Sequence, residues 1–161
     1  MVRWIKLAGK QWFGFWWLGL VLFGIQEIPY MIMPFVRLEA NPIMEMQNKS
    51  VFLNGCEKVL GSLCIALMCF LVHENVKFFA VETMKEKVFF GAAVAVILAN
   101  FVGWGLYFSG YQSIEIIIGF LVVLPPLYYI LIGLWRKNYM LVAVGCMFAV
   151  SHMTNVWNNL R

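Results

Sequence analysis

The chain has 161 residues, of which 63% are hydrophobic and only 12% are charged, and its mean hydropathy is +0.81. Soluble domains have about 45–50% apolar and about 25% charged residues, so this composition excludes a water-soluble fold. It predicts one all-α domain over residues 1–161, a polytopic transmembrane helix bundle in the cell membrane with the lipid bilayer as its partner. The net charge of +4 is too small to indicate nucleic-acid binding.

Five membrane spans are predicted along the chain. A helix needs about 20 mostly apolar residues to cross ~30 Å of hydrocarbon. Basic residues precede the first apolar run as in a signal peptide, but no small-x-small cleavage site follows, so we expect this run to be a retained span. The expected spans cover about residues 12–35, 51–72, 88–108, 113–135 and 139–157.

The links between the spans are short and carry turn and interface signals. Residues 108–112 (FSGYQ) predict a tight hairpin, and residues 135–138 (WRKN) predict an interface with basic anchors, so the last three spans should pack as antiparallel neighbours. Trp12, Trp16 and Trp17 suit an aromatic belt at the membrane boundary. Neither of the longer links could form a second domain.

The distribution of basic residues predicts the orientation. If the N-terminus and the links after the second and fourth spans share one side, that side has eight Lys and Arg and the other side has four. The positive-inside rule then places the N-terminus in the cytoplasm and the C-terminus outside. The eight residues are Arg3, Lys6, Lys10, Lys77, Lys85, Lys87, Arg136 and Lys137.

Polar side chains within the spans are the candidate functional residues. An ionisable group costs roughly 2.5–3.5 kcal/mol in hydrocarbon on insertion scales, so it usually faces the bundle interior or water. With the predicted orientation, these groups all fall in the outer half of the bilayer. Ser151, His152 and Asn155 share one helix face, and Pro29 frees a backbone carbonyl near Glu27. The predicted ligand-binding residues are Gln26, Glu27, Glu57, Lys58, Asn100, Glu115, His152 and Asn155.

Each candidate also has a structural interpretation. Glu27 could form an internal ion pair with Lys58 at a similar depth, and Glu57 and Glu115 could simply be solvated. His152 could be a core histidine bonded to a carbonyl, a general acid or base beside a glutamate, or a metal ligand. Because the only other histidine lies near the opposite membrane face, we expect no multi-histidine metal site.

Other motifs favour structural roles. Gly103 and Gly105 suit a helix-packing face, with a ligand contact as the alternative, and Gly61 would let another backbone approach. The four cysteines form no C-x-x-C pair and suit reduced core thiols, while the ten methionines suit packing more than a soft-metal path. No phosphate-binding glycine loop, G-x-S-x-G elbow or H-E-x-x-H helix is present, so no cofactor is expected.

Four segments together resemble a known family. They are residues 22–29 (LFGIQEIP), 100–104 (NFVGW), 107–111 (YFSGY) and 124–126 (LPP). Their arrangement resembles the HXXEE-domain integral membrane proteins, which have several spans and a His-x-x-Glu-Glu signature in the first. In this alignment Phe23 stands at the signature histidine and Gln26 at the first glutamate, which leaves Glu27. The resemblance implies a multi-span architecture and no particular activity.

Three functions are compatible with these residues. The favoured hypothesis is a binding, transport or immunity protein whose polar pocket in the outer half of the bilayer holds a small polar or amphiphilic ligand. The second is an intramembrane enzyme that acts on a lipid, with Glu27 and His152 as the candidate catalytic pair and Asn100 orienting the substrate. The third is a structural subunit that binds a partner membrane protein.

The predicted orientation can be tested by cysteine labelling in intact cells. In a chain without its native cysteines, Asn41→Cys should react with an impermeant thiol reagent, because residue 41 is expected outside. Lys85→Cys should not react, because residue 85 is expected in the cytoplasm. The reverse pattern would overturn the orientation.

Overall fold

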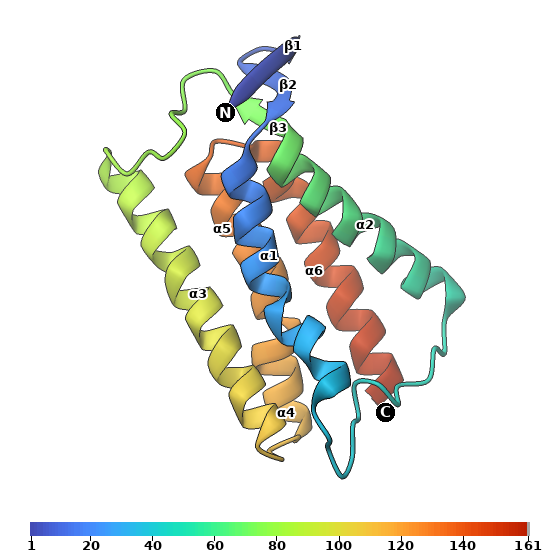
Figure 1. Cartoon of the computed structure of the whole chain (residues 1–161). Helices are drawn as coiled ribbons and strands as arrows, with labels where there is room; N and C mark the ends of the chain where they lie inside the picture. Colours follow the sequence, from blue (N-terminus) through green and yellow to red (C-terminus); the bar gives the residue numbers. More distant parts are fainter. Residues whose placement is uncertain (161) are drawn as a thin grey trace.

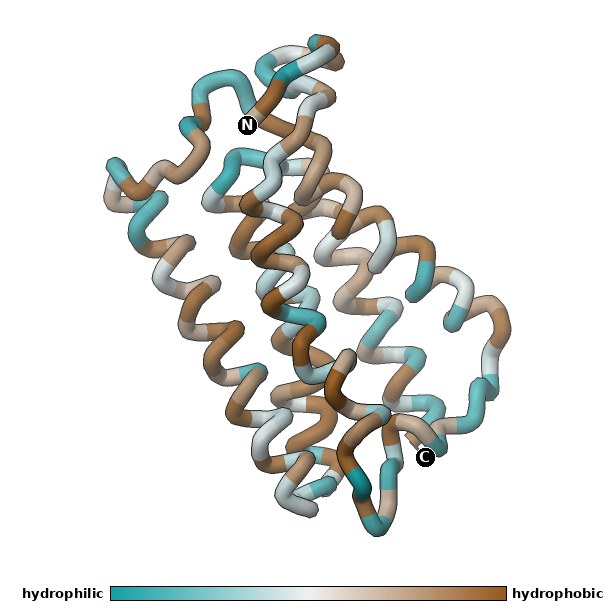
Figure 2. The backbone as a smooth tube through the Cα atoms, in the orientation of Figure 1, coloured by the Kyte–Doolittle hydropathy of each residue, from teal (hydrophilic) through white to brown (hydrophobic). Residues whose placement is uncertain are grey.

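Five long helices dominate the computed structural model, which describes residues 1–160 (Figure 1). Each is long and apolar enough to cross a membrane, as predicted. Figure 2 shows hydrophobic residues along the helices and hydrophilic residues in the loops at both ends. The helices are α1 (Trp17–Ile32), continued by the 3-10 turn η1 (Met33–Phe35); α2 (Val51–Phe70); α3 (Met84–Phe108); the fourth, made of α4 (Ile114–Ile116), the π-helix η2 (Ile117–Val122) and α5 (Leu124–Trp135); and α6 (Tyr139–Leu160).

A small antiparallel sheet caps one end of the bundle, so the all-α prediction was wrong for residues 2–15 and 71–73. Its strands are β1 (Val2–Ala8), β2 (Gln11–Phe15) and β3 (Leu71–His73), in the order β1-β2-β3. The β1–β2 turn has Gly9 at φ +54°, which is the backbone conformation that two-residue hairpin turns favour. We call this end of the bundle the strand end.

The sheet also shifts the predicted helix boundaries. The first helix begins at Trp17 and not at residue 12, because residues 11–15 pair in β2, and the second ends at Phe70 because residues 71–73 form β3. The third begins four residues earlier than predicted. There the Thr83 hydroxyl accepts from the Glu86 backbone N–H at 3.2 Å, and the Glu86 carboxylate accepts from the Thr83 N–H at 3.0 Å.

The helices pack as the turn signals predicted. α5 lies against both α3 and α6, with the chain reversing direction between neighbours, while α2 packs against α6 and α1 (Figure 1). The predicted packing role of Gly103 is confirmed, since a Cβ there would lie 2.2 Å from the Phe120 Cβ. At Gly105 a Cβ would meet nothing within 4 Å, so this glycine takes no part in the contact.

Trp16 belongs to the core and not to an aromatic belt, which corrects the prediction for this residue. Its side chain is only 2% exposed, whereas Trp17 is 51% exposed. The Trp16 Nε1 donates to the Phe78 carbonyl at 2.9 Å, and the Arg136 guanidinium lies 4.2 Å from the Trp16 ring centroid. The indole therefore joins the first helix to the loop between β3 and α3.

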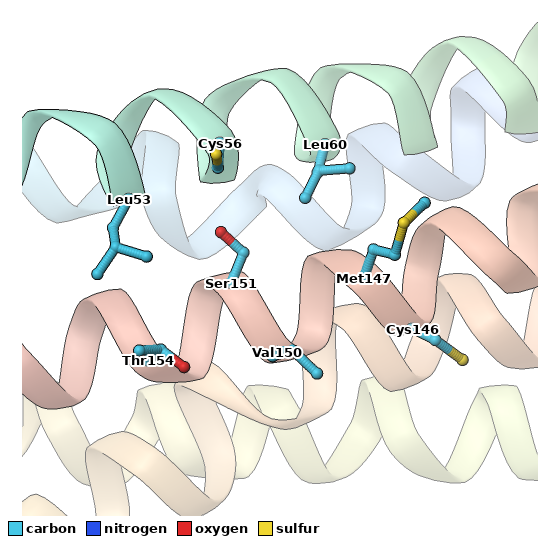
Figure 3. A pocket seen from close by; sticks show the side chains of 8 residues that line it. All are labelled: Leu53, Cys56, Leu60, Cys146, Met147, Val150, Ser151 and Thr154. Carbon is cyan, nitrogen blue, oxygen red and sulfur yellow. The ribbon is translucent and has the colours of Figure 1, made fainter.

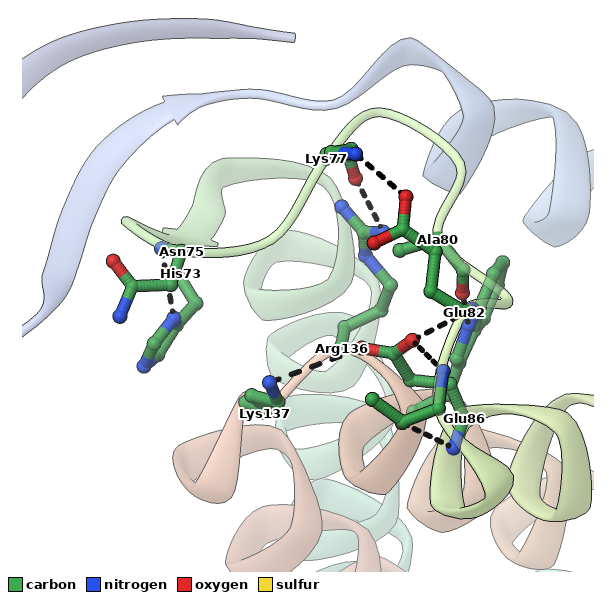
Figure 4. A network of polar contacts seen from close by, with 10 residues as sticks. His73, Asn75, Lys77, Ala80, Glu82, Glu86, Arg136 and Lys137 are labelled. Carbon is green, nitrogen blue, oxygen red and sulfur yellow. Dashed lines mark hydrogen bonds and ion pairs between the residues drawn. The ribbon is translucent and has the colours of Figure 1, made fainter.

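Arg136 organises the polar contacts at the strand end (Figure 4). It donates to the Lys77 carbonyl at 2.8 Å, while the Trp135 Nε1 donates to the Ala80 carbonyl at 2.6 Å. Burial lowers the pKa of Arg136 to about 10, so the guanidinium stays charged at neutral pH. These contacts fasten residues 74–83 across the end of the bundle.

Two consecutive prolines follow the π-helix of the fourth helix and leave carbonyls without backbone donors. Residues 125–126 have no N–H, so in the i→i+5 pattern the carbonyls of Phe120 and Leu121 receive no backbone donor. Asn100 Nδ2 donates to the Phe120 carbonyl at 2.8 Å, and the Tyr30 hydroxyl donates to the Leu121 carbonyl at 3.5 Å. Side chains from α3 and α1 thus replace the missing bonds.

We predict that Asn100→Ala lowers the thermal unfolding temperature of the detergent-solubilised protein. The variant leaves the buried Phe120 carbonyl without its donor, which costs about 1–3 kcal/mol. Asn158→Ala is the control, because residue 158 is exposed on the last helix. Equal unfolding temperatures for Asn100→Ala and wild type would contradict the structural role of Asn100.

Candidate functional site

The strongest polar cluster in the helices joins α2 to α6 through Glu57. Its Oε1 lies 2.9 Å from Nδ1 of His152, and its Oε2 accepts a hydrogen bond from the Asn155 amide. His152 and Asn155 are one helical turn apart, so a single face of α6 presents both groups to one carboxylate. The predicted grouping on α6 therefore meets a residue of α2 that was also predicted.

The Glu57 contact fixes the chemistry of the His152 ring. A carboxylate only accepts hydrogen bonds, so Nδ1 carries a proton, and in the neutral form of the ring the lone pair is then on Nε2. Within residues 1–160, Nε2 has no hydrogen-bond partner. The ring is held on one side by Phe148, which stacks at 5.2 Å between centroids with 19° between planes. His152 is thus oriented by its neighbours while one acceptor stays free.

A cavity of about 200 Å³ lies between α1, α2, α5 and α6, and Glu27 and His152 both line it. Glu27 and His152, the candidate catalytic pair of the sequence analysis, therefore lie around the same space. Aromatic rings form much of the remaining wall. The other lining residues are Gln26, Tyr30, Gly61, Ile65, Pro125, Tyr129 and Phe148.

A second cavity of about 160 Å³ shares Tyr30 and His152 with the first. Glu57 lines it, and so do Ile43 and Met46 from the link between α1 and α2. That link lies at the end of the bundle opposite the strands (Figure 1). The two cavities therefore extend from the centre of the bundle towards that end, where Figure 2 shows hydrophilic positions within α1, α2 and α6.

The Glu27 carboxylate has no ion pair within residues 1–160, although its side chain is half-buried. The expected ion pair with Lys58 is wrong, because Lys58 is exposed on α2. Beside Glu27, the Gln26 side chain is 2% exposed and its Oε1 has no hydrogen-bond partner. Two adjacent acceptors of α1 thus line the first cavity without partners.

Three predicted residues lie outside both cavities and outside the Glu57 cluster, whereas Asn155 lines neither cavity but contacts Glu57. The Asn100 amide is used on the Phe120 carbonyl, and Lys58 and Glu115 are exposed. Glu115 sits at the start of the fourth helix, where Ser113 caps the first turn. The structure therefore brings together Gln26, Glu27, Glu57, His152 and Asn155, and separates the other three from them.

Sequence reasoning missed the aromatic wall of the first cavity, although helical spacing contained a signal for part of it. Tyr30 follows Glu27 by three residues and Phe148 precedes His152 by four, so each ring shares a helix face with a predicted polar residue. Tyr129 lies on a helix for which no polar residue indicated the inward face. Gly61 was predicted to let another backbone approach, and this prediction was wrong. Gly61 instead makes room for the Phe148 ring, which would lie 3.3 Å from a Cβ at this position.

Another cavity, of about 530 Å³, is an apolar groove between α2 and α6 (Figure 3). Its lining is apolar apart from small groups, and the Ser151 hydroxyl points across it towards α2 without a hydrogen-bond partner. No charged side chain lines it. The groove therefore offers apolar contact and little specific recognition.

Neither a metal site nor a known relative identifies the protein. Within residues 1–160, no three His, Cys or acidic side chains lie close enough together to hold a metal ion. No family model matches the sequence, and no curated protein or solved structure matches it. The resemblance to the HXXEE-domain proteins stays a prediction.

We predict that Glu57→Gln lowers the unfolding free energy by about 1.5–3 kcal/mol, because the charge-assisted bonds to His152 and Asn155 are lost. Thermal unfolding in detergent measures the effect. Glu115→Gln is the matched control, since it removes the same charge at an exposed position. If both variants unfold at the same temperature, Glu57 does not join the helices.

Proposed function

We propose that the chain is a multi-pass membrane protein with its strand end in the cytoplasm. The five apolar helices and their many exposed large hydrophobic side chains support the membrane location. The basic residues of the N-terminal strands, of residues 74–87 and of residues 136–137 gather at the strand end, which supports the orientation. The cavities beside Glu27 and His152 then lie in the outer half of the bilayer.

Within this frame, the proposed function is the binding of a small polar or amphiphilic ligand, as in a transport or immunity protein. The observation that carries the proposal is the half-buried Glu27 carboxylate, which lines a cavity with His152 and has no ion pair in the described chain. An unpaired carboxylate among apolar helices is costly. A role that only stabilises the bundle would favour a paired group, whereas a binding site needs an unpaired one.

The cavity walls support binding over a purely structural subunit. Ligand sites combine a mostly apolar wall with a few convergent polar groups. Here Tyr30, Tyr129 and Phe148 supply the wall, while Glu27 and His152 supply polar groups from different helices. A surface for a partner helix would instead expose such groups on the outside of the bundle.

An intramembrane enzyme is the second candidate, and one observation favours it. The contact of 2.9 Å between Glu57 and His152 is the arrangement by which a carboxylate orients a histidine for general base catalysis. The pair differs from the expected one, since Glu57 and not Glu27 contacts His152. An enzyme would lose lipid turnover in proteoliposomes on His152→Ala and keep its ligand affinity, whereas a binding protein would lose affinity.

A cysteine placed in the cavity tests whether the cavity is open to water. In a cysteine-free chain reconstituted in nanodiscs, Ile65→Cys should react with methyl methanethiosulfonate at least about tenfold faster than Leu63→Cys, because only a hydrated thiol ionises to the reactive thiolate. Ile65 lines the cavity, whereas Leu63 is exposed on the outer surface of the same helix. Equal rates would contradict a hydrated binding cavity.

A further inference from the structure

Three polar atoms around the first cavity are hydrogen-bond acceptors without a partner in residues 1–160. The Glu27 carboxylate has no ion pair, and the Gln26 Oε1 is buried without a partner. In the neutral His152 ring, the Nε2 carries a lone pair because the proton is on Nδ1, which faces Glu57. All three are acceptors. A ligand that satisfies them must bring donors, and it must offset the charge of Glu27.

The aromatic wall also favours a positively charged ligand. Tyr30, Tyr129 and Phe148 line the cavity, and the centroids of the Tyr129 and Phe148 rings are 6.2 Å apart. Ring faces carry negative charge density and attract organic cations within about 6 Å. No lysine or arginine side chain lines either cavity, so no positive group of the lining competes for this place.

From these two observations we propose that the site binds a small organic amine in its protonated form, with the ammonium group among Glu27, Gln26 and His152 and the carbon chain against the aromatic wall. An ammonium group has three N–H donors for the three acceptors. The cavity volumes of about 200 and 160 Å³ fit a short alkyl chain and not a large lipid. This inference deepens the proposed function and rests on it.

Electrostatics separates this ligand class from neutral and anionic ones of the same size. An anion would face Glu27 and Glu57 without a compensating cation, and a neutral alcohol would bring one donor and no charge. Removing the Glu27 charge should therefore weaken binding of the amine by at least about tenfold and leave binding of an alcohol almost unchanged.

The test uses hexylamine, hexan-1-ol and hexanoate as probes on the purified full chain in nanodiscs at neutral pH. Thermal stabilisation by each probe is measured for wild type, Glu27→Gln and Glu115→Gln. Hexylamine alone should stabilise wild type and Glu115→Gln, and Glu27→Gln should lose the effect. Glu115→Gln corrects for partition of the amine into the disc, since it removes the same charge away from the cavities.

Each other outcome overturns the proposal in a distinguishable way. Stabilisation by hexan-1-ol equal to that by hexylamine would mean that the cavity binds ligands without selecting a cation, which leaves the proposed binding function in place. An amine effect that survives in Glu27→Gln would place the cation elsewhere. If no probe stabilises the protein, the amine site is rejected, and the reaction rate at Ile65→Cys decides separately whether the cavity is open.

Discussion

A polar group among apolar helices is stabilised when a hydrogen-bond partner reaches it, and such pairs join the helices of this bundle. Asn100 and Tyr30 supply donors to carbonyls that the consecutive prolines leave open, and Glu57 receives donors from α6. Glu27 differs from these residues, because its carboxylate lines a cavity without such a partner. The paired polar groups hold the helices together, and the proposed ligand would supply the partner that the Glu27 carboxylate lacks.

The helices were predictable because the length and hydropathy of a spanning segment follow directly from the thickness of hydrocarbon. The N-terminal hairpin was not predicted, because residues 12–15 of its second strand were counted as the beginning of the first span. A local signal existed, since Gly9 separates two short runs rich in β-branched and aromatic residues. No local pattern predicts β3, because residues 71–73 form a strand only through pairing with β2.

The members of the site could be predicted better than their contacts. Depth in a spanning helix depends on residue count, so Glu27, Glu57 and His152 were placed at a common level from sequence. The rotation of each helix about its axis is harder to predict, because these helices are apolar on nearly every face and no polar stripe indicates the outer one. For that reason Lys58 was placed inside although it is exposed, and the histidine was assigned to Glu27 although Glu57 contacts it.

Hydrogen bonds from outside α2 hold the end of this helix that lies at the strand end. At the strand end, the Trp16 N–H donates to the Cys69 carbonyl at 2.8 Å, and the Asn138 amide donates to the Leu67 and Leu71 carbonyls at 2.9 and 3.2 Å. A 20-residue helix is about 30 Å long, so a tilt of about 5° around this pivot moves the far tip by roughly 2–3 Å. Glu57, which contacts His152 and Asn155 on α6, lies near that tip. The Glu57 contacts therefore fasten the part of α2 that the strand end does not hold.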